Sequence, residues 1–224
     1  MKAMLLAAGR GERLRPLTDR IPKALVPVGG KPLLAWHLER LAASGCREAV
    51  INVSHLAQRI IDYVGDGARF GLRVAYSREA EPLETAGGLA QALPLLGSAP
   101  FLLVNADIYC EADFRRLLAF ELGAMLAHLV LVANPPHRPQ GDFSLDAARV
   151  CNDGAPRYTY AGVAVMSPQL LRSVRRGEKA PLAPLLRGAA EAQRLSGELL
   201  AGLWQDVGTA ERLAELETQL AARK

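Results

Sequence analysis

Short apolar runs and longer segments of mixed character alternate along the first 133 residues. The apolar runs predict buried strands at 1–6, 48–53, 72–76, 101–104 and 128–133. In the segments between them, apolar positions recur every three or four residues, which predicts helices over 32–44, 55–64, 85–96 and 111–120. Alternating strands and helices are typical of a mostly parallel sheet covered by helices. We therefore expect an α/β domain.

Local signals mark the ends of two of these helices. Pro32 suits the first turn of a helix, and Gly45 suits the position just after the last turn. Ser54 belongs to the residue types that cap helix N-termini, so we expect it to cap the helix over 55–64.

The rhythm changes after residue 133. Prolines between 134 and 139 predict a loop, and apolar runs at 143–145 and 157–166 predict a small antiparallel section. A helix over 181–193, a short strand over 199–203 and an amphipathic helix over 210–222 follow. We expect one domain over residues 1–224, made of a first part, 1–133, and a second part, 134–224.

Composition narrows the class of protein. Half of the 224 residues are hydrophobic, as in globular proteins, and the formal net charge is only +4. Basic residues gather in the first thirty positions, so a local anionic ligand explains the excess without nucleic acid. Three distant cysteines without a CxxC pair indicate reduced thiols of the cytosol. The sequence has neither an apolar run of membrane-spanning length nor a signal-peptide pattern, so we expect a cytoplasmic protein without a membrane partner.

A glycine-rich, basic loop follows the first strand, where 6–18 reads LAAGRGERLRPLT. Gly9 and Gly11 let the backbone approach a ligand and form an anion-binding nest, and Arg13 adds a guanidinium suited to phosphate. Leu14 replaces the third glycine of a Rossmann fingerprint, and the Gly-Lys-Ser/Thr of a Walker loop is absent. We interpret the loop as a polyphosphate site; the alternative is a flexible turn with solvated arginines.

Lys23 stands between two prolines in an otherwise apolar stretch. Pro22 and Pro27 stiffen the backbone on either side, so we expect the lysine to be positioned beside the loop. The alternative is an ordinary surface lysine.

Two distant aspartates are candidate magnesium ligands. Asp107 follows the strand over 101–104, and ligands of open α/β sheets bind beyond the carboxyl ends of the strands. Asp206 lies between a strand and a helix, with Gly208 close behind. Mg²⁺ often uses one or two protein carboxylates together with phosphates. Alternatively, Asp107 caps the turn that follows, and Asp206 is incidental while Thr209 caps the last helix.

Glu84 precedes a Gly-Gly pair at the start of a predicted helix. Gly87 and Gly88 could admit a flat base or a ribose next to exposed N–H groups. A plain turn is the alternative. The sequence contains no Gly-x-Ser-x-Gly elbow, so covalent catalysis has little support.

Taken together, these motifs resemble the signature of the sugar-1-phosphate nucleotidylyltransferases. The resemblance rests on 6–18, 22–28 (PKALVPV), 30–33 (GKPL), 84–88 (ETAGG), 160–163 (YAGV) and 204–209 (WQDVGT), in family order. It implies a Rossmann-like, three-layer α/β/α fold of the nucleotide-diphospho-sugar transferase type, with a small antiparallel sugar-binding section in the second part and nucleotide binding in the first. Ala106 departs from the pattern, because glycine usually precedes the metal aspartate.

The resemblance also implies roles for individual residues. The expected reaction transfers a nucleotidyl group from a nucleoside triphosphate to a sugar-1-phosphate and releases pyrophosphate, with Mg²⁺ as cofactor. Catalysis falls to Arg13 and Lys23, metal binding to Asp107 and Asp206, nucleotide binding to Ala8, Gly9, Gly11, Glu84, Ala86, Gly87 and Gly88, and sugar contacts to Gly141 and Gly162.

Within the family, the short chain and the segments 83–88 and 141–143 resemble uridylyltransferases of peptidoglycan recycling, which implies UTP as the nucleotide. Mannose-1-phosphate guanylyl transfer, and nucleotidyl transfer to glucose- or N-acetylglucosamine-1-phosphate, stay open as alternatives. A non-catalytic nucleotide-sugar sensor is an alternative of another class. Its weakness is that a pure binder has little need of both aspartates. The sequence predicts no particular oligomeric state.

Overall fold

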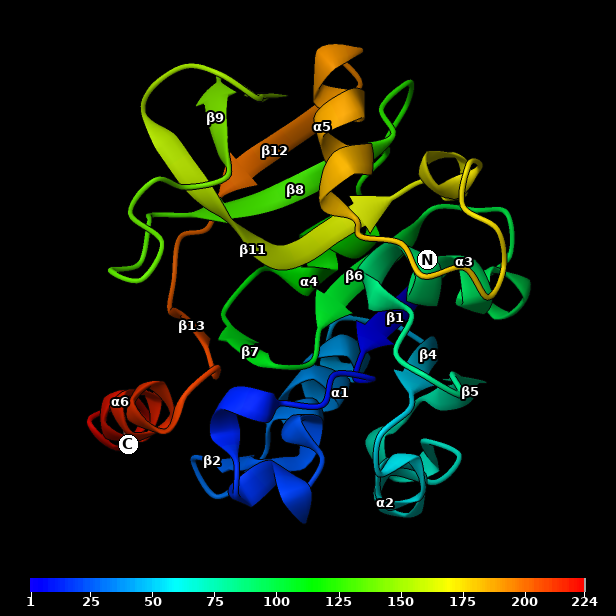
Figure 1. Cartoon of the computed structure of the whole chain (residues 1–224), viewed down its shortest axis with the longest axis vertical. Coiled ribbons are helices and arrows are strands. Elements are labelled where there is room, and N and C mark those ends of the chain that lie inside the picture. Colours follow the sequence, from blue (N-terminus) through cyan, green and yellow to red (C-terminus); the bar gives the residue numbers. More distant parts are fainter. Residues whose placement is uncertain (224) are drawn as a thin grey trace.

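A nine-stranded mixed sheet runs through the middle of the computed structural model, which describes residues 1–223 (Figure 1). Its strand order is β5-β4-β1-β6-β11-β8-β12-β10-β9. The strands are β1 (Lys2–Leu6), β4 (Glu48–Val53), β5 (Arg73–Arg78), β6 (Phe101–Asn105), β8 (Ala127–Val132), β9 (Phe143–Asp146), β10 (Arg149–Cys151), β11 (Arg157–Met166) and β12 (Leu195–Leu199). β10 and β11 run opposite to the other strands of this sheet.

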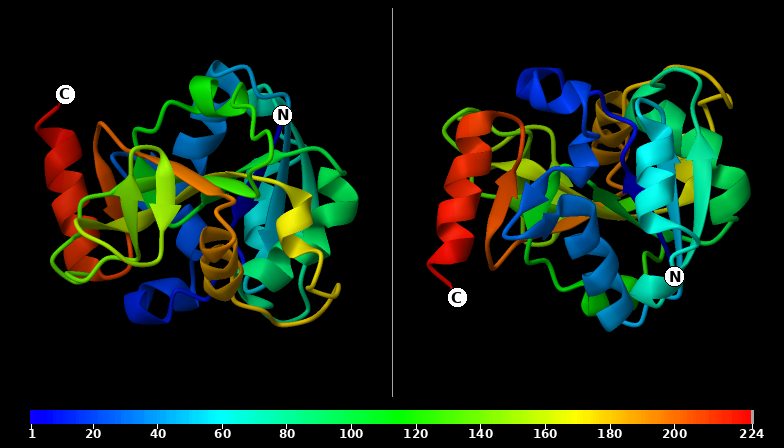
Figure 2. Two further views of the ribbon diagram at one scale, coloured as in Figure 1. Left: turned by 90° about the horizontal axis from the view of Figure 1, so that it is seen from above. Right: turned by 90° about the horizontal axis from the view of Figure 1, so that it is seen from below.

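Helices cover both faces of the sheet (Figure 2). One face carries α1 (Leu33–Ala43), α2 (Ala57–Val64) and α4 (Phe114–Leu118), and the other carries α3 (Glu84–Leu96) and α5 (Ala183–Glu191). Successive strand residues serve opposite faces: Leu5 packs in the core under α1, whereas Met4 packs in the core under α3. The predicted three-layer α/β/α fold is therefore confirmed.

The last helix, α6 (Ala210–Ala221), lies beside the sheet and closes a third apolar cluster. Leu216 and Leu220 of α6 pack there with Leu14 of the glycine-rich loop and Val28 of the hairpin β2 (Pro27–Val28) and β3 (Lys31–Pro32). The helix therefore ties the end of the described chain to its beginning.

A second small sheet pairs β7 (Ile108–Cys110) with β13 (Trp204–Asp206). This pairing was not expected from the sequence. It shortens the helix predicted over 111–120, which begins only at Phe114, where Asp113 accepts a hydrogen bond from the Arg116 N–H. The strand predicted over 199–203 was wrong: β12 ends at Leu199, after pairing in parallel with β8.

Other predicted elements are confirmed to within a few residues, and one cap is not. The helix predicted over 55–64 begins at Ala57, and its cap position is taken by Leu56, whose φ is +53°. Ser54 therefore does not cap it. The antiparallel section predicted near 143–166 is confirmed, and β11 carries it into the central sheet between β6 and β8.

Two further expectations concern the chain as a whole. The division into parts 1–133 and 134–224 stays a prediction, and Lys224 lies outside the described residues. Within residues 1–223, the helices are all too short or too polar to cross a bilayer.

Candidate functional site

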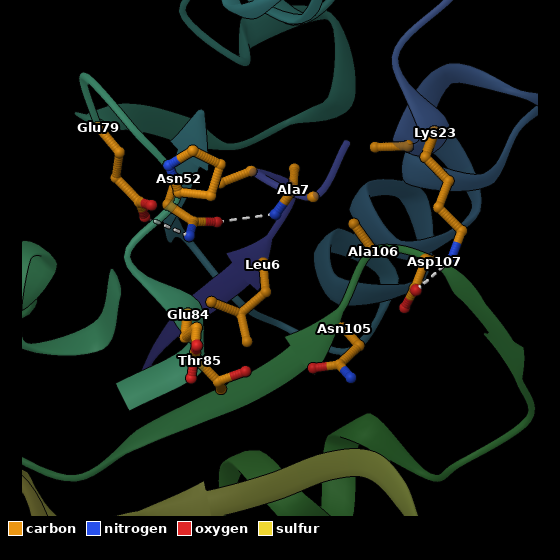
Figure 3. A pocket seen from close by; sticks show the side chains of 14 residues that line it. Leu6, Ala7, Lys23, Asn52, Glu79, Glu84, Thr85, Asn105, Ala106 and Asp107 are labelled. Carbon is orange, nitrogen blue, oxygen red and sulfur yellow. Dashed lines mark hydrogen bonds and ion pairs between the residues drawn. The ribbon is translucent and has the colours of Figure 1, made fainter. Parts of the chain in front are cut away.

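Two cavities open where β1 and β6 reach their carboxyl ends, the edge at which open α/β sheets bind ligands. The first, of about 200 Å³, is lined by residues 6–9, at and just after the end of β1, and by 105–107, at and just after the end of β6 (Figure 3). The second, of about 490 Å³, lies against β11 and α5. Glu84, Thr85, Asn105 and Asp107 line both cavities, so the two form one continuous site.

A chain of hydrogen bonds fixes one wall of the first cavity (Figure 3). The Ala7 N–H donates to Asn52 Oδ1 at 2.7 Å, and Asn52 Nδ2 donates to Glu79 Oε1 at 2.7 Å. The other Glu79 oxygen accepts from the Leu83 N–H at 3.0 Å. Both polar side chains are buried, so their positions are firmly held. Neither Asn52 nor Glu79 was predicted from the sequence, although the polar Asn52 inside the apolar run 48–53 is a usable signal.

Lys23 reaches the end of β6 from the opposite wall (Figure 3). Its Nζ lies 2.5 Å from Asp107 Oδ2, and its side chain is 11% exposed. Pro22 is the N-cap of the 3₁₀ turn Lys23–Leu25 that carries it. The structure thus brings Lys23 to Asp107, eighty-four residues further along the chain. Ala106 lines the same cavity outside the left-handed region, so its methyl group adds no backbone strain.

A cation-rich opening lies outside these cavities. It is lined by Arg10, Gly11, Glu12, Arg13, Lys23, Glu81, Pro82, Lys179 and Gly208. Arg13 also lines the second cavity, and Lys23 the first. Gly11 has a φ of +67°, and its carbonyl accepts from the Leu14 N–H and the Thr18 hydroxyl. Two hydrogen bonds therefore hold the turn of this basic loop.

Asp206 joins the site through the pairing of β13 with β7, where it stands opposite Ile108. Arg212 Nη1 donates to Asp206 Oδ2 at 2.6 Å and lies 2.7 Å from His137 Nε2. A guanidinium only donates, so His137 Nε2 accepts and cannot donate to the other aspartate oxygen, 3.2 Å away. That oxygen, Asp206 Oδ1, is buried without a hydrogen-bond partner among residues 1–223.

These two aspartates fit a magnesium ion. A buried carboxylate oxygen with no donor is costly on its own and is satisfied by a cation. Asp107 and Asp206 line the same cavity. No cluster of three or more His, Cys, Asp or Glu side chains that could hold a metal occurs within 1–223. Two protein carboxylates completed by phosphate oxygens and water are a usual magnesium arrangement.

The predicted residues at the start of α3 divide into two groups. Glu84, with a φ of +59°, lines both cavities. The Ala86 and Gly87 N–H groups instead donate to the Ala180 carbonyl at 2.9 and 3.1 Å. Gly88 packs behind the wall formed by Asn52 and Glu79. The structure therefore places Ala86, Gly87 and Gly88 behind the cavity wall rather than on it. Ala8 and Gly9 lie on it.

The second cavity holds one of the two predicted sugar contacts, and the other lies beside it. Gly162, with a φ of +78°, packs against Asn105 and lines this cavity. Gly141 lines a shallow depression next to it, together with Arg157 and Arg187. The Tyr160 hydroxyl is buried without a partner among residues 1–223, and burial raises its pKa, so it stays a proton donor.

Residues 2–145 match the family model of the nucleotidyl transferases. The chain therefore belongs to the nucleotidyl transferase family. It is 50% identical to the N-acetylmuramate alpha-1-phosphate uridylyltransferase of Neisseria meningitidis serogroup B, over 100% of both chains. It is 29% identical to the mannose-1-phosphate guanylyltransferase catalytic subunit beta of Drosophila pseudoobscura pseudoobscura, over 92% of this chain and 59% of that relative.

Two solved structures share the fold. One is a Bacillus anthracis protein assigned as a glucose-1-phosphate thymidylyltransferase, in complex with a sucrose, with a TM-score of 0.87, 18% identity and coverage of 98% and 95% of the two chains. The other is a UDP-glucose pyrophosphorylase complexed with UDP-glucose, with a TM-score of 0.80, 16% identity and coverage of 100% and 99%. They confirm the predicted nucleotide-diphospho-sugar transferase type of fold.

Proposed function

We propose that this chain transfers the uridylyl group of UTP to N-acetylmuramate α-1-phosphate and releases pyrophosphate. The observation that carries the reaction class is the convergence of Lys23, Asp107 and Asp206 on the walls of two connected cavities. The substrate is inferred from the full-length similarity to the Neisseria uridylyltransferase. We infer that the reaction belongs to peptidoglycan recycling in the cytoplasm.

We assign each substrate to its own part of the site. The first cavity, with its fixed wall of Asn52 and Glu79, takes the base and ribose. The cation-rich opening takes the triphosphate, with Arg13 on the departing pyrophosphate. The second cavity takes the sugar, next to Gly162. The first part of the chain therefore binds nucleotide, and the second part supplies most of the sugar cavity.

The chemistry is an in-line displacement at the α-phosphorus of UTP. A phosphate oxygen of the sugar-1-phosphate attacks, and pyrophosphate leaves on the opposite side. Lys23, between the first cavity and the cation-rich opening, would steady the α-phosphate as negative charge builds. Asp107 and Asp206 would hold Mg²⁺, which supplies further neutralisation of phosphate charge when bound.

A substrate grid tests this proposal. Pyrophosphate release is measured with Mg²⁺, crossing UTP, GTP, CTP and dTTP with the 1-phosphates of N-acetylmuramate, N-acetylglucosamine, glucose and mannose. Preference for UTP with N-acetylmuramate-1-phosphate supports the proposal. Preference for another pair, such as GTP with mannose-1-phosphate, keeps the reaction class and overturns the substrate. If folded protein still binds UTP but releases no pyrophosphate with any pair, the result would favour a non-catalytic nucleotide-sugar sensor.

A further inference from the structure

Arg187 is a cation on the wall of the second cavity. Arg187, on α5, lines both this cavity, which contains Gly162, and the depression beside it, which contains Gly141. Among residues 1–223, its guanidinium makes no hydrogen bond or ion pair. Its backbone is held in place, because its carbonyl accepts from Asn152 Nδ2 at 3.0 Å.

The neighbouring arginines are already engaged. The three guanidinium nitrogens of Arg157 donate hydrogen bonds to the carbonyls of Gln140, Asp142 and Asn152. Arg138 Nη1 lies 3.6 Å from Oδ2 of Asp142, which also lines this cavity. Asp142 Oδ2 also accepts from the Tyr160 N–H at 2.9 Å, so its charge is compensated. Arg13 also lines this cavity, but the proposed function assigns it to the departing pyrophosphate. Arg187 is therefore the positive charge that is left for a group on the proposed sugar.

The chemistry of the proposed substrate supplies a matching anion. N-acetylmuramate differs from N-acetylglucosamine by a lactyl ether on O3, which ends in a carboxylate. A guanidinium presents two parallel N–H donors that match the two oxygens of a carboxylate. The Phe143 ring centroid lies 5.8 Å from the Arg187 guanidinium carbon and supports it from one side.

We propose that Arg187 is a specificity-determining residue that binds the lactyl carboxylate and selects sugar acids over neutral sugars. The inference rests on the proposed function, because it assumes that the second cavity takes the sugar-1-phosphate. Arg187 takes no part in the phosphoryl chemistry, which occurs next to Lys23 and Asp107. It acts on the choice of sugar alone.

The test is a cycle of two changes, one in the ligand and one in the protein. The ligands are N-acetylmuramate-1-phosphate and the same compound with its lactyl carboxylate converted to a methylamide. The proteins are wild type, Arg187→Met, Arg187→Lys and the control Arg138→Met, which removes an arginine of the same cavity. The readout is kcat/KM for each sugar at saturating UTP and Mg²⁺, because the ratio between ligands is insensitive to a general loss of folded enzyme.

We expect wild type to prefer the carboxylate by about 10–100-fold, the range of a charge-assisted pair. In Arg187→Met the ratio falls close to one, while kcat/KM for the amide changes little. Arg187→Lys keeps part of the ratio, and Arg138→Met keeps most of it.

Other results overturn the inference. If Arg187→Met keeps the wild-type ratio, or if Arg138→Met abolishes it instead, Arg187 does not read the carboxylate, and the proposed function stands. The same holds if wild type uses both ligands equally. If wild type turns over neither ligand but accepts a different sugar-1-phosphate, the proposed substrate itself has failed, and the inference fails with it.

Discussion

The backbone N–H of Val207 donates a hydrogen bond of 2.9 Å to the carbonyl oxygen of Asp107. This contact continues the pairing of β13 with β7 and fixes Asp206 relative to Asp107 through the backbone. The two candidate metal ligands therefore keep their spacing without depending on each other's side chains.

Lys23→Ala removes the cation closest to the end of β6. Preorganised donors of this kind contribute roughly 3–4 kcal/mol to the barrier, so kcat should fall by about 10²–10³-fold. The matched control is Lys31→Ala, which removes a lysine paired with Glu39 outside the cavities. Steady-state pyrophosphate release measures both variants. Near-normal turnover of Lys23→Ala would mean that the lysine has no catalytic role.

Arg212→Met leaves Asp206 without its cation. Both side chains are mostly buried, so the free energy of unfolding in EDTA should fall by about 1–3 kcal/mol. Mg²⁺ should then raise the melting temperature more in the variant than in wild type, because metal no longer competes with the guanidinium. The control is Arg223→Met, which breaks a more exposed ion pair with Glu111. Equal Mg²⁺ shifts in wild type and Arg212→Met would contradict the assignment of Asp206.

Gly9→Ala separates ligand binding from folding. A Cβ at Gly9 would meet nothing within 4 Å, and its φ lies outside the left-handed region, so the melting temperature should not change. The methyl group would occupy the wall of the first cavity and weaken UTP binding by about 1–3 kcal/mol, the usual cost of overpacking. Calorimetric titration with UTP measures the loss. Unchanged affinity would place the nucleotide elsewhere.

Gly87→Ala tests the packing behind the cavity wall. A Cβ there would overlap the carbonyl oxygen of Glu178, so we expect a loss of about 1–3 kcal/mol in the free energy of unfolding. Gly188→Ala is the control, because α5 leaves open space around that glycine. It should gain about 0.5–1 kcal/mol through helix propensity. Urea unfolding measures both variants. A Gly87→Ala variant as stable as wild type would show that the segment around Glu178 shifts at little cost in free energy.

His37 makes stability depend on pH. Burial lowers its pKa from 6.5 to about 4, while Nε2 lies 2.7 Å from the Ile108 carbonyl. Between pH 6.5 and about 4, this histidine is protonated in the unfolded chain but not in the folded chain. Its burial therefore does not reduce the free energy of unfolding above pH 6.5, and it reduces that free energy increasingly as the pH falls toward 4. The loss reaches at most about 3 kcal/mol.

The check is urea unfolding at pH 7 and pH 4.5 in wild type and His37→Gln. The variant should lose much less stability on acidification. His128 is unchanged in both proteins, and because burial also lowers its pKa, some pH dependence should remain. An identical slope in the two proteins would exclude His37 as the source.

Much of this architecture could be predicted, because burial leaves a regular trace in the sequence. The strand over 48–53 was predicted with the bounds that β4 has, since both faces of β4 are buried and every position except Glu48 and Asn52 is apolar. Lys23 and Asp107 could be nominated because prolines and a strand end restrict where each can lie. Their contact in the structure follows from the order of β1 and β6 in the sheet.

The parts that escaped prediction depend on contacts between distant segments. In the sequence, Arg212 is one of several charged residues of an amphipathic helix. Only the packing of α6 beside β13 shows that it binds Asp206. Likewise, nothing local indicates that Asn52 and Glu79 face each other, because that contact depends on how β4 pairs with β5. Short strands such as β7 give no period to detect in three residues.

The packing of α6 over the third apolar cluster has a consequence for the folding of the chain during its synthesis. Leu14 and Val28 leave the ribosome well before Leu216 and Leu220, which pack against them. Until then the nascent chain exposes an apolar face beside its phosphate loop and lacks Asp206 and Arg212. A ribosome-bound fragment without α6 therefore has an incomplete site, and competence for catalysis should arise only once α6 has docked.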